Sequence, residues 1–402
     1  MGEAIGQQIE VDVTKIAHGG IAVARHEGRV VFVSDAIPGE RVLVRVSDDS
    51  KQRFWRADTL RVLEPSPHRR EHVWAAASLD REPEERAGGA EFGHIELAHQ
   101  RELKRQVLAE ALQRMAGLEP EFEVEALPGD DEKGGTGWRT RVRLHVDDRG
   151  RPGPYAARSH RVIPVSELPL ATAELSAAAP LDQTFAGFPH VDVLAPSSGG
   201  VRLVIGDQKP STITEVVAGR EFQLADTGFW QVHRHAAQTL SSAVQEAIDA
   251  QRFDERAANL DLYGGVGLLA AAVAQRFGAG TRIRSVEADD TATGYAAENL
   301  AEWIGARAET GRVDRWLRQA APDLDGATVV LDPPRSGAGR EVIETLGRLG
   351  PAQLVYVACD PVAFARDAAL LAAQGYALES LRAFDLFPST HHVEAVSRWG
   401  RI

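Results

Sequence analysis

The first 64 residues alternate between apolar and polar side chains in short runs separated by turn signals. Ile9-Glu-Val-Asp-Val-Thr14 has the period of two that a half-buried strand requires. Four similar runs follow at residues 21–24, 29–34, 40–46 and 54–63, and turns that contain glycine or proline precede the first three of them. Five short strands at this spacing predict a small β-barrel over residues 1–64, and Pro65-Ser-Pro67 marks its end.

The next region, residues 68–225, mixes two periodicities and predicts an α+β domain. Residues 97–115 have helical periodicity, with apolar side chains from Leu103 to Leu112 on one face. Residues 138–146 alternate as a strand whose exposed face is expected to carry Arg139, Arg141 and Arg143. Such a row of arginines is either a solvated strand face or a surface that contacts the phosphates of a nucleic acid.

From residue 226 onward, strand patterns alternate with helix patterns. This order predicts a doubly wound, Rossmann-like parallel sheet over residues 226–402. The expected strands are 258–263, 282–287, 327–332 and 354–358, and an alanine-rich helix is expected at 268–277.

Composition limits the functional classes. The chain has 402 residues, of which 44% are hydrophobic and 26% charged, and no run approaches the roughly 20 apolar residues of a membrane span. The start of the chain has no signal-peptide pattern, so a cytoplasmic protein is expected. A net charge of −13 argues against a general nucleic-acid coat but permits a local basic groove. A single cysteine excludes an intrachain disulfide and a four-thiolate metal site, and no metal is expected.

A glycine loop between the first strand and helix of the third region indicates a nucleotide-type ligand. Gly264-Gly-Val-Gly267 would let backbone approach a ligand at the helix N-terminus. Glu287 ends the next strand about 20 residues later, where a carboxylate can bind two ribose hydroxyls. The spacing suits a dinucleotide or S-adenosylmethionine, and an ordinary strand-to-helix turn is the other interpretation. The acidic Asp261 before the loop is typical of methyltransferases.

Two further strand ends carry reactive groups. Asp332-Pro-Pro-Arg335 ends the strand at 327–332, and its prolines stiffen a loop that offers carboxylate acceptors. Methyltransferases that act on exocyclic amines generally have an aromatic residue where Arg335 stands, so amine methylation is disfavoured. Cys359, the single thiol, follows the strand at 354–358, at the sheet edge where α/β folds bind ligands. A buried core cysteine is the alternative.

Three sequence blocks together resemble the signature of S-adenosylmethionine-dependent RNA uracil-5-methyltransferases. They are Asp332-Pro-Pro-Arg335, Ala358-Cys-Asp-Pro-Val-Ala-Phe-Ala-Arg-Asp367 and Phe387-Pro-Ser-Thr-His-His-Val-Glu394. Phe229-Trp-Gln231-Val-His233 resembles the entry to the catalytic domain of that family. The amino-terminal barrel resembles the TRAM RNA-binding domain. The resemblance spans nearly the whole chain and implies a class I methyltransferase fold.

The resemblance also implies roles for individual residues. Carbon 5 of uracil becomes nucleophilic only after a thiolate adds to carbon 6, and a base must later remove the carbon 5 proton. By family position, Cys359 is the nucleophile and Glu394 is the base. The residues expected to bind S-adenosylmethionine are Gln231, Tyr263, Gly265, Gly267, Glu287 and Asp332, and those expected to contact RNA are Arg139, Arg141, Arg143 and Arg335.

Departures from the family pattern change some expectations. Many members bind an iron–sulfur cluster through four cysteines, but Ala90 and Leu168 stand at two of those positions. We therefore expect no iron–sulfur cluster. His233 and Asp360 each replace an asparagine, and Asp360 places a negative charge beside the residue that must become a thiolate.

Two alternative functions stay open. An RNA cytosine-5-methyltransferase uses similar chemistry but usually pairs two cysteines. A non-catalytic RNA-binding protein could keep the methyltransferase fold. The RNA could be transfer or ribosomal RNA, and we expect a monomer.

Overall fold

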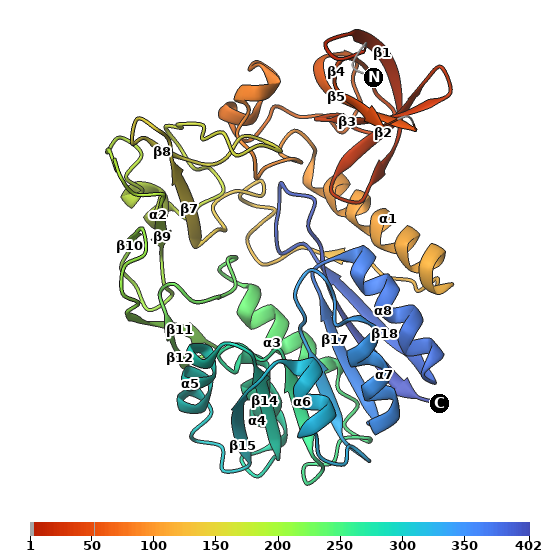
Figure 1. Ribbon diagram of the computed structural model, residues 1–402, viewed down its shortest axis with the longest axis vertical. Helices are drawn as coiled ribbons and strands as arrows, with labels where there is room; N and C mark the ends of the chain where they lie inside the picture. The colour runs from red at the N-terminus through yellow and green to blue at the C-terminus, as the bar shows by residue number, and fades with distance from the viewer. Residues whose placement is uncertain (1–3, 52) are drawn as a thin grey trace.

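The computed structural model describes residues 4–51 and 53–402. Figure 1 shows a red barrel at the top, a yellow-green region of mixed structure beside it, and a large sheet with helices below. A dark blue loop from the large sheet rises toward the barrel in the middle of the molecule.

The amino-terminal strands close into a barrel in the order β1-β2-β3-β5-β4, so the prediction of a small barrel is confirmed. Valines at alternate positions, such as Val31 and Val33, point inward and are fully buried. The pair β3–β5 is parallel, and the other pairs, including β1–β4, which closes the barrel, are antiparallel. The strands are β1 (Gln8–Ala17), β2 (Ile21–His26), β3 (Arg29–Ser34), β4 (Arg41–Lys51) and β5 (Phe54–Glu64).

The barrel is attached to the rest of the chain by buried contacts. Its apolar core continues into Phe92, Ile95 and Leu103, which belong to later segments. The buried Glu40 accepts a hydrogen bond of 2.7 Å from Arg69. Removing the barrel would therefore expose apolar surface and leave the half-buried Arg69 without its carboxylate partner.

The large sheet has eight strands in the order β15-β14-β13-β16-β17-β19-β18-β6. The five strands from β15 to β17 are parallel, as predicted, whereas β17–β19 and β19–β18 are antiparallel. The sequence analysis did not predict this antiparallel hairpin. The strands are β6 (Val124–Glu125), β13 (Asn259–Leu262), β14 (Ile283–Glu287), β15 (Ala306–Thr310), β16 (Thr328–Leu331), β17 (Gln353–Ala358), β18 (Tyr376–Phe384) and β19 (Glu394–Arg401).

Helices cover both faces of this sheet and form two apolar cores. One core joins the sheet to α1, α6, α7 and α8, and the other joins it to α3, α4 and the α5 region. The central strands β13, β16 and β17 are buried along their whole length, which explains their continuous apolar runs. The helices are α1 (Leu97–Ala116), α3 (Ala236–Ala247), α4 (Leu268–Phe277), α5 (Asp290–Asn299), α6 (Val313–Gln319), α7 (Gly339–Leu349) and α8 (Pro361–Ala373).

The middle region contributes a four-stranded sheet in the order β10-β9-β7-β8 and a separate hairpin of β11 and β12. The hairpin buries Ile213 and Phe222 in the same core as α3 and α4. Because α1 and β6 also pack with the large sheet, the division into 1–64, 68–225 and 226–402 stays a prediction. The elements are η1 (Ala75–Ala77), η2 (Pro83–Glu85), β7 (Arg141–Val146), β8 (Pro152–Gly153), α2 (Ala173–Ala178), β9 (His190–Leu194), β10 (Arg202–Ile205), β11 (Thr212–Val217) and β12 (Arg220–Ala225).

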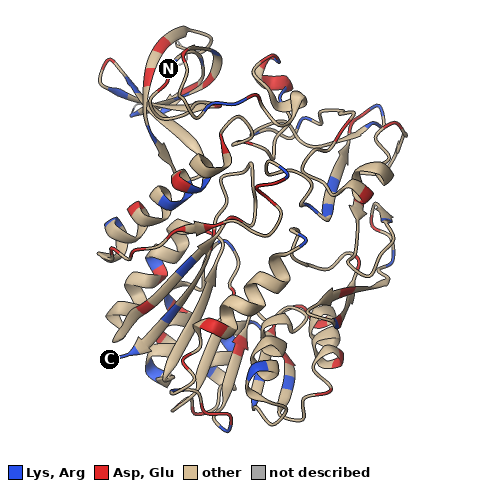
Figure 2. Cartoon of the chain, turned by 180° about the vertical axis from the view of Figure 1, so that it is seen from behind, with Lys and Arg blue, Asp and Glu red and all other residues tan. Residues whose placement is uncertain are grey.

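The expected exposed row of arginines on β7 is only partly correct. Arg143 is exposed, but Arg139 and Arg141 are half-buried. Arg141 lies 3.6 Å from Glu215, and this buried carboxylate explains why the arginine turns inward. Figure 2 shows acidic and basic residues mixed along the helices. Within the described ranges, no helix is long and apolar enough to span a membrane.

Candidate active site

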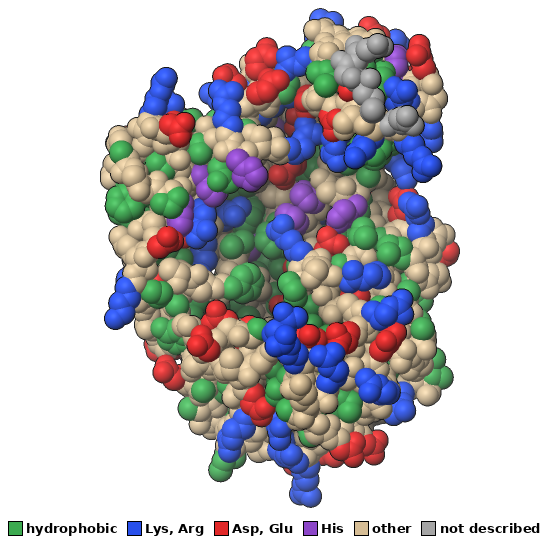
Figure 3. All heavy atoms as spheres, viewed as in Figure 1, with side chains coloured by type: hydrophobic (Ala, Val, Ile, Leu, Met, Phe, Trp, Pro, Cys, Tyr) green, Lys and Arg blue, Asp and Glu red, His purple; other side chains and the backbone are tan. Residues whose placement is uncertain are grey.

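A cavity of about 1220 Å³ opens where the parallel strands end. Figure 3 shows a hollow in the middle of this face, with histidine side chains gathered along its upper part. The cavity unites nine of the twelve site residues predicted from the sequence: Arg139, Gln231, Tyr263, Gly265, Glu287, Asp332, Arg335, Cys359 and Glu394.

Cys359 follows the last residue of β17 and is half-buried at the cavity wall. Burial raises the pKa of its thiol to about 12, and the carboxylates of Glu394 and Asp332 contribute in the same direction. Arg335 opposes this shift. The thiol is therefore protonated in the RNA-free protein at neutral pH, so forming the thiolate depends on nearby charges.

Asp360, the residue beside the thiol, begins helix α8. Its Oδ1 accepts hydrogen bonds from the backbone N–H groups of Val362 (3.0 Å) and Ala363 (2.8 Å). This is the N-cap arrangement, in which a short acidic side chain satisfies free donors at a helix start. The exchange of asparagine for aspartate thus preserves the cap while adding a charge next to Cys359.

Glu394 reaches the thiol because of the antiparallel strand β19. Ala358 of β17 pairs with Ala395 of β19. Cys359 and Glu394 are the next residues beyond this pair, so the antiparallel pairing brings both to the same edge of the cavity. The Glu394 side chain is buried, and both burial and the nearby Asp332 raise its pKa well above the usual range. A carboxylate with a raised pKa is a stronger proton acceptor once it is ionised.

Asp332 lies between these two residues and the glycine loop. Burial raises its pKa to about 7. Arg335, three residues later, is exposed and contacts the ring Nε2 of His392 at 3.4 Å. One acidic group and one cation therefore face the thiol from the same loop.

The glycine loop forms the opposite end of the cavity. A side chain at Gly264 would collide with Ser285 and Asp261, so only glycine allows the loop to lie this close to the strands. Glu287 Oε2 accepts a hydrogen bond of 3.1 Å from Gly265 N–H, and Oε1 accepts from the backbone of Ala288 and Asp289. These bonds fix the carboxylate at the cavity wall while leaving acceptor capacity for ribose hydroxyls.

A second acidic group lies beneath the glycine loop, outside the lining of the cavity. Asp261 is buried, burial raises its pKa to about 7, and its Oδ1 has no hydrogen-bond partner among the described residues. Tyr263 lines the cavity with a φ of 63°, a backbone conformation that is unusual for a bulky residue. Tyr263 and Glu287 thus line the end of the cavity where the ribose and the methionine part of S-adenosylmethionine are expected to bind.

Three predicted residues lie outside the cavity wall. Gly267 begins α4 with a φ of 88°, and a side chain there would press on Leu300, so it serves the close packing of the helix. Arg141 is turned toward Glu215. Arg143 makes a two-pronged ion pair with Asp192 of β9, with both N···O distances at 2.7 Å.

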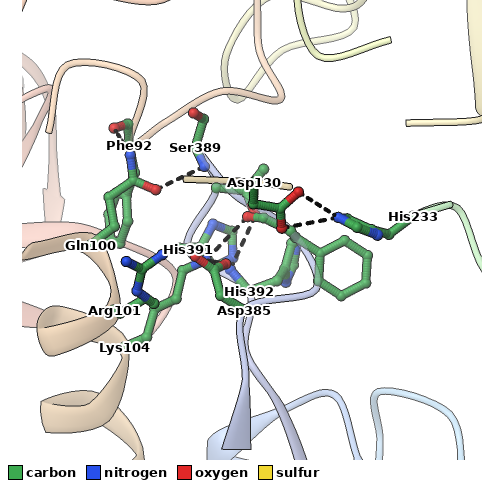
Figure 4. A network of polar contacts seen from close by, with 12 residues as sticks. Phe92, Gln100, Arg101, Lys104, Asp130, His233, Asp385, Ser389, His391 and His392 are labelled. Carbon is green, nitrogen blue, oxygen red and sulfur yellow. Dashed lines mark hydrogen bonds and ion pairs between the residues drawn. The ribbon is translucent and has the colours of Figure 1, made fainter. Parts of the chain in front are cut away.

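The sequence analysis missed a buried polar network that supports the loop before Glu394 (Figure 4). Lys104 of α1 lies fully buried, 2.5 Å from Asp385 Oδ1, and donates to the carbonyl of Phe387 at 3.1 Å. Gln100 accepts a hydrogen bond of 2.8 Å from Ser389 N–H. A signal was present, because Gln100 and Lys104 occupy positions on the otherwise apolar face of their helix.

Two further departures from the family pattern, at His233 and at the positions of Ala90 and Leu168, have structural explanations. His233 is buried, stacks on Trp138, and its Nε2 lies 3.1 Å from both carboxylate oxygens of Asp130 (Figure 4). Ala90 and Leu168 both pack in one apolar cluster, and neither side chain has an atom that can ligate iron. Throughout the described ranges, no group of three or more His, Cys, Asp or Glu side chains could hold a metal ion.

Comparisons with known proteins identify relatives of this chain. Residues 189–398 match the family model described as tRNA (Uracil-5-)-methyltransferase, and residues 3–58 match the TRAM domain model. An uncharacterized RNA methyltransferase of Streptomyces avermitilis is 37% identical, with 98% of each chain covered. One of Bifidobacterium longum is 34% identical, with 98% of this chain and 97% of the relative covered.

A solved structure supports the fold. The Pyrococcus abyssi tRNA (uracil-54, C5)-methyltransferase, in complex with S-adenosyl-L-homocysteine, superposes with a TM-score of 0.70 at 20% identity. The match covers 97% of this chain and all of the other.

Proposed function

Because this chain belongs to the tRNA (uracil-5-)-methyltransferase family and carries a TRAM domain, we propose that it forms 5-methyluridine in RNA. It is an S-adenosylmethionine-dependent RNA methyltransferase, and its RNA substrate is a transfer or ribosomal RNA. The observation that carries the proposal is the meeting of Cys359 and Glu394 in one cavity with the glycine loop and Glu287.

The first chemical step needs a thiolate at Cys359. Its sulfur adds to carbon 6 of the uracil, and the electron pair of the 5,6 double bond moves into an enolate that makes carbon 5 nucleophilic. Arg335 is the cation next to the thiol, and it favours both the thiolate and the negative charge that the uracil gains. Asp332, with its raised pKa, can present a proton to the base edge.

S-adenosylmethionine would be held by Glu287 and the glycine loop, and when bound it would supply the methyl group to carbon 5 and be left as S-adenosylhomocysteine. Glu394 then removes the carbon 5 proton, the double bond re-forms and the Cys359 sulfur leaves as a thiolate. Burial keeps water away from Glu394 and raises its proton affinity, which suits this step. The uracil must leave its stack to enter the cavity, because carbons 5 and 6 are covered by neighbouring bases in a helix.

The single thiol argues against cytosine-5 methylation by the usual two-cysteine arrangement. The chain has one cysteine, and Arg335-Ser-Gly follows the two prolines where the second thiol would stand. The order of steps on uracil requires one thiol and one base, which the cavity provides.

A trapping experiment tests the proposal. In a Glu394→Gln variant, addition and methyl transfer can proceed but the carbon 5 proton stays, so a methylated protein–RNA adduct should accumulate on denaturing gels. The adduct should disappear in the Cys359→Ala/Glu394→Gln double variant. Glu341→Gln is a matched control, because Glu341 borders the same cavity but belongs to α7 and pairs with Arg318 on the surface.

Two results would contradict the proposal. Full turnover by Glu394→Gln would assign the base to another residue. Binding of S-adenosylmethionine without methyl transfer to transfer or ribosomal RNA would favour a non-catalytic RNA-binding protein. Comparing 5-methyluridine sites in RNA from strains with and without the gene identifies the substrate.

A further inference from the structure

A loop of the barrel lies against the candidate active site. Residues 18–20 connect β1 to β2, and they line a second, smaller cavity of about 150 Å³ together with residues of the catalytic region. Its polar lining consists of His18, Lys104, Arg335, Asp360, His391 and His392, and the Cys359 thiol borders it. The nucleophile therefore lies between two cavities, and the barrel forms a wall of the smaller one.

Close packing fixes this loop in place. Gly20 has a φ of 70°, and a Cβ built there would lie 2.5 Å from the Cβ of His391 and 3.1 Å from the ring of Phe92. Only glycine allows this approach. Gly20 N–H also donates to the carbonyl of Ala17 at 3.1 Å, which closes the turn. The side chain of His18 is thus presented from a rigid turn.

His18 contacts the residue next to the nucleophile. Its Nε2 lies 3.3 Å from Asp360 Oδ2, and the other carboxylate oxygen accepts the two N–H groups at the start of α8. Each oxygen of Asp360 thus has its own partner, one in the helix and one in the barrel. The Asp360 carboxylate also disfavours ionisation of the Cys359 thiol.

We propose that His18 is a positioning residue for the nucleophile. By holding Asp360 Oδ2 toward the barrel, it directs the negative charge away from the Cys359 sulfur and keeps the first turn of α8 in place. The barrel is then part of the active site in addition to being an RNA-binding module. The inference rests on the proposed function and deepens it, since it assigns a positioning partner to Asp360, the residue beside the thiol that the proposed reaction uses.

The test uses the fact that Cys359 is the single cysteine of the chain. Alkylation of the full-length protein by iodoacetamide, without RNA or methyl donor, reports the thiolate at this one site. At fixed pH, His18→Ala should slow alkylation about three- to tenfold, because an unopposed charge beside the sulfur disfavours the thiolate. Asp360→Asn should be faster than the parent protein, since the charge is gone and the cap is kept.

The double variant decides between positioning and plain structural damage. His18→Ala/Asp360→Asn should react at the rate of Asp360→Asn, because residue 360 no longer carries the negative charge that His18 positions. His26→Ala is the matched control, since His26 lies at the opposite end of β2, and it should not change the rate.

Several outcomes would overturn the inference. They are an unchanged rate in His18→Ala, an equal slowing by His26→Ala, or a double variant that stays slow although Asp360 is neutral. Because no RNA is used, the result does not depend on whether methyl transfer to uracil occurs. If alkylation behaves as expected but no RNA is methylated, the proposed reaction fails while the role of His18 stands.

Discussion

The two ends of the main cavity are built in different ways. The end with Gly265 and Glu287 comes from two successive strand-to-helix turns, after β13 and β14, which pair as neighbours in the sheet. The end with Cys359 and Glu394 draws on the loop after β16, the loop after β17, the antiparallel β19 and the loop before it, and the barrel turn at His18 borders the thiol. One end is local in sequence and the other is assembled over most of the chain.

This difference indicates which end of the cavity can be changed by mutation without affecting other properties of the protein. The groups proposed to bind the methyl donor are held by backbone hydrogen bonds within and between these two neighbouring turns, such as Asp289 N–H to Glu287 and Gly265 N–H to Glu287. The groups around the thiol depend on buried long-range partners, such as Lys104 with Asp385. Changes at the donor end should therefore affect one ligand, whereas changes at the thiol end should affect chemistry, RNA binding and stability together.

The largest effect is expected at the thiol. Cys359→Ser should reduce methyl transfer by at least about a thousandfold, since a serine hydroxyl is far less ionised and nucleophilic than a thiol. S-adenosylmethionine affinity, measured by calorimetry, should stay within about twofold, because the donor end is built separately. Methylation by Cys359→Ser near the parent rate would contradict the covalent mechanism.

A second prediction addresses the donor end. Glu287→Ala should weaken S-adenosylmethionine binding at least about tenfold, because a charge-assisted ribose contact contributes roughly 1.5–3 kcal/mol. Alkylation of Cys359 should not change. Unchanged affinity in calorimetry would remove Glu287 from the site, and a changed alkylation rate would show that the two ends are coupled.

The same contrast explains what the sequence could predict. The barrel strands and the parallel strands β13, β14, β16 and β17 follow from apolar periodicity, and the glycine loop with Glu287 follows from local spacing. The family resemblance supplied Cys359 and Glu394, but neither local pattern nor spacing predicted the hairpin that brings them together.

Long-range partners could not be predicted from local pattern. Nothing near Arg141 in sequence indicates that Glu215, more than 70 residues away, draws it inward. Likewise, the pairing of His18 with Asp360 depends on how the barrel docks on the catalytic region. The polar residues on the buried face of α1 were the one local signal of such a contact.

A third prediction compares two arginines that the sequence treated alike. Arg139 lines the cavity, whereas Arg143 is exposed and paired with Asp192. Arg139→Ala should weaken RNA binding about three- to tenfold and reduce its salt dependence, and Arg143→Ala should change affinity less than about twofold. Filter binding at several salt concentrations measures both. A larger loss of RNA affinity in Arg143→Ala than in Arg139→Ala would indicate that the RNA binds along the open face of β7.

The smallest effect is expected on the thermal stability of the protein, which the ionisation of Asp332 should lower near neutral pH. Burial raises the folded-state pKa of Asp332 from 3.8 to about 7. A carboxyl whose pKa is higher in the folded than in the unfolded state binds its proton more tightly when folded, so stability falls as pH rises from about 4 to about 7.

Asp332→Asn removes this titration. Its melting temperature should exceed that of the parent protein by about 2–5 °C at pH 8, and the difference should shrink at pH 5. Asp325→Asn, in an exposed loop, is the control and should show no such pH-dependent gain. Equal melting temperatures at pH 8 would mean that ionisation of Asp332 does not lower the stability, and would contradict the raised pKa of this half-buried carboxyl.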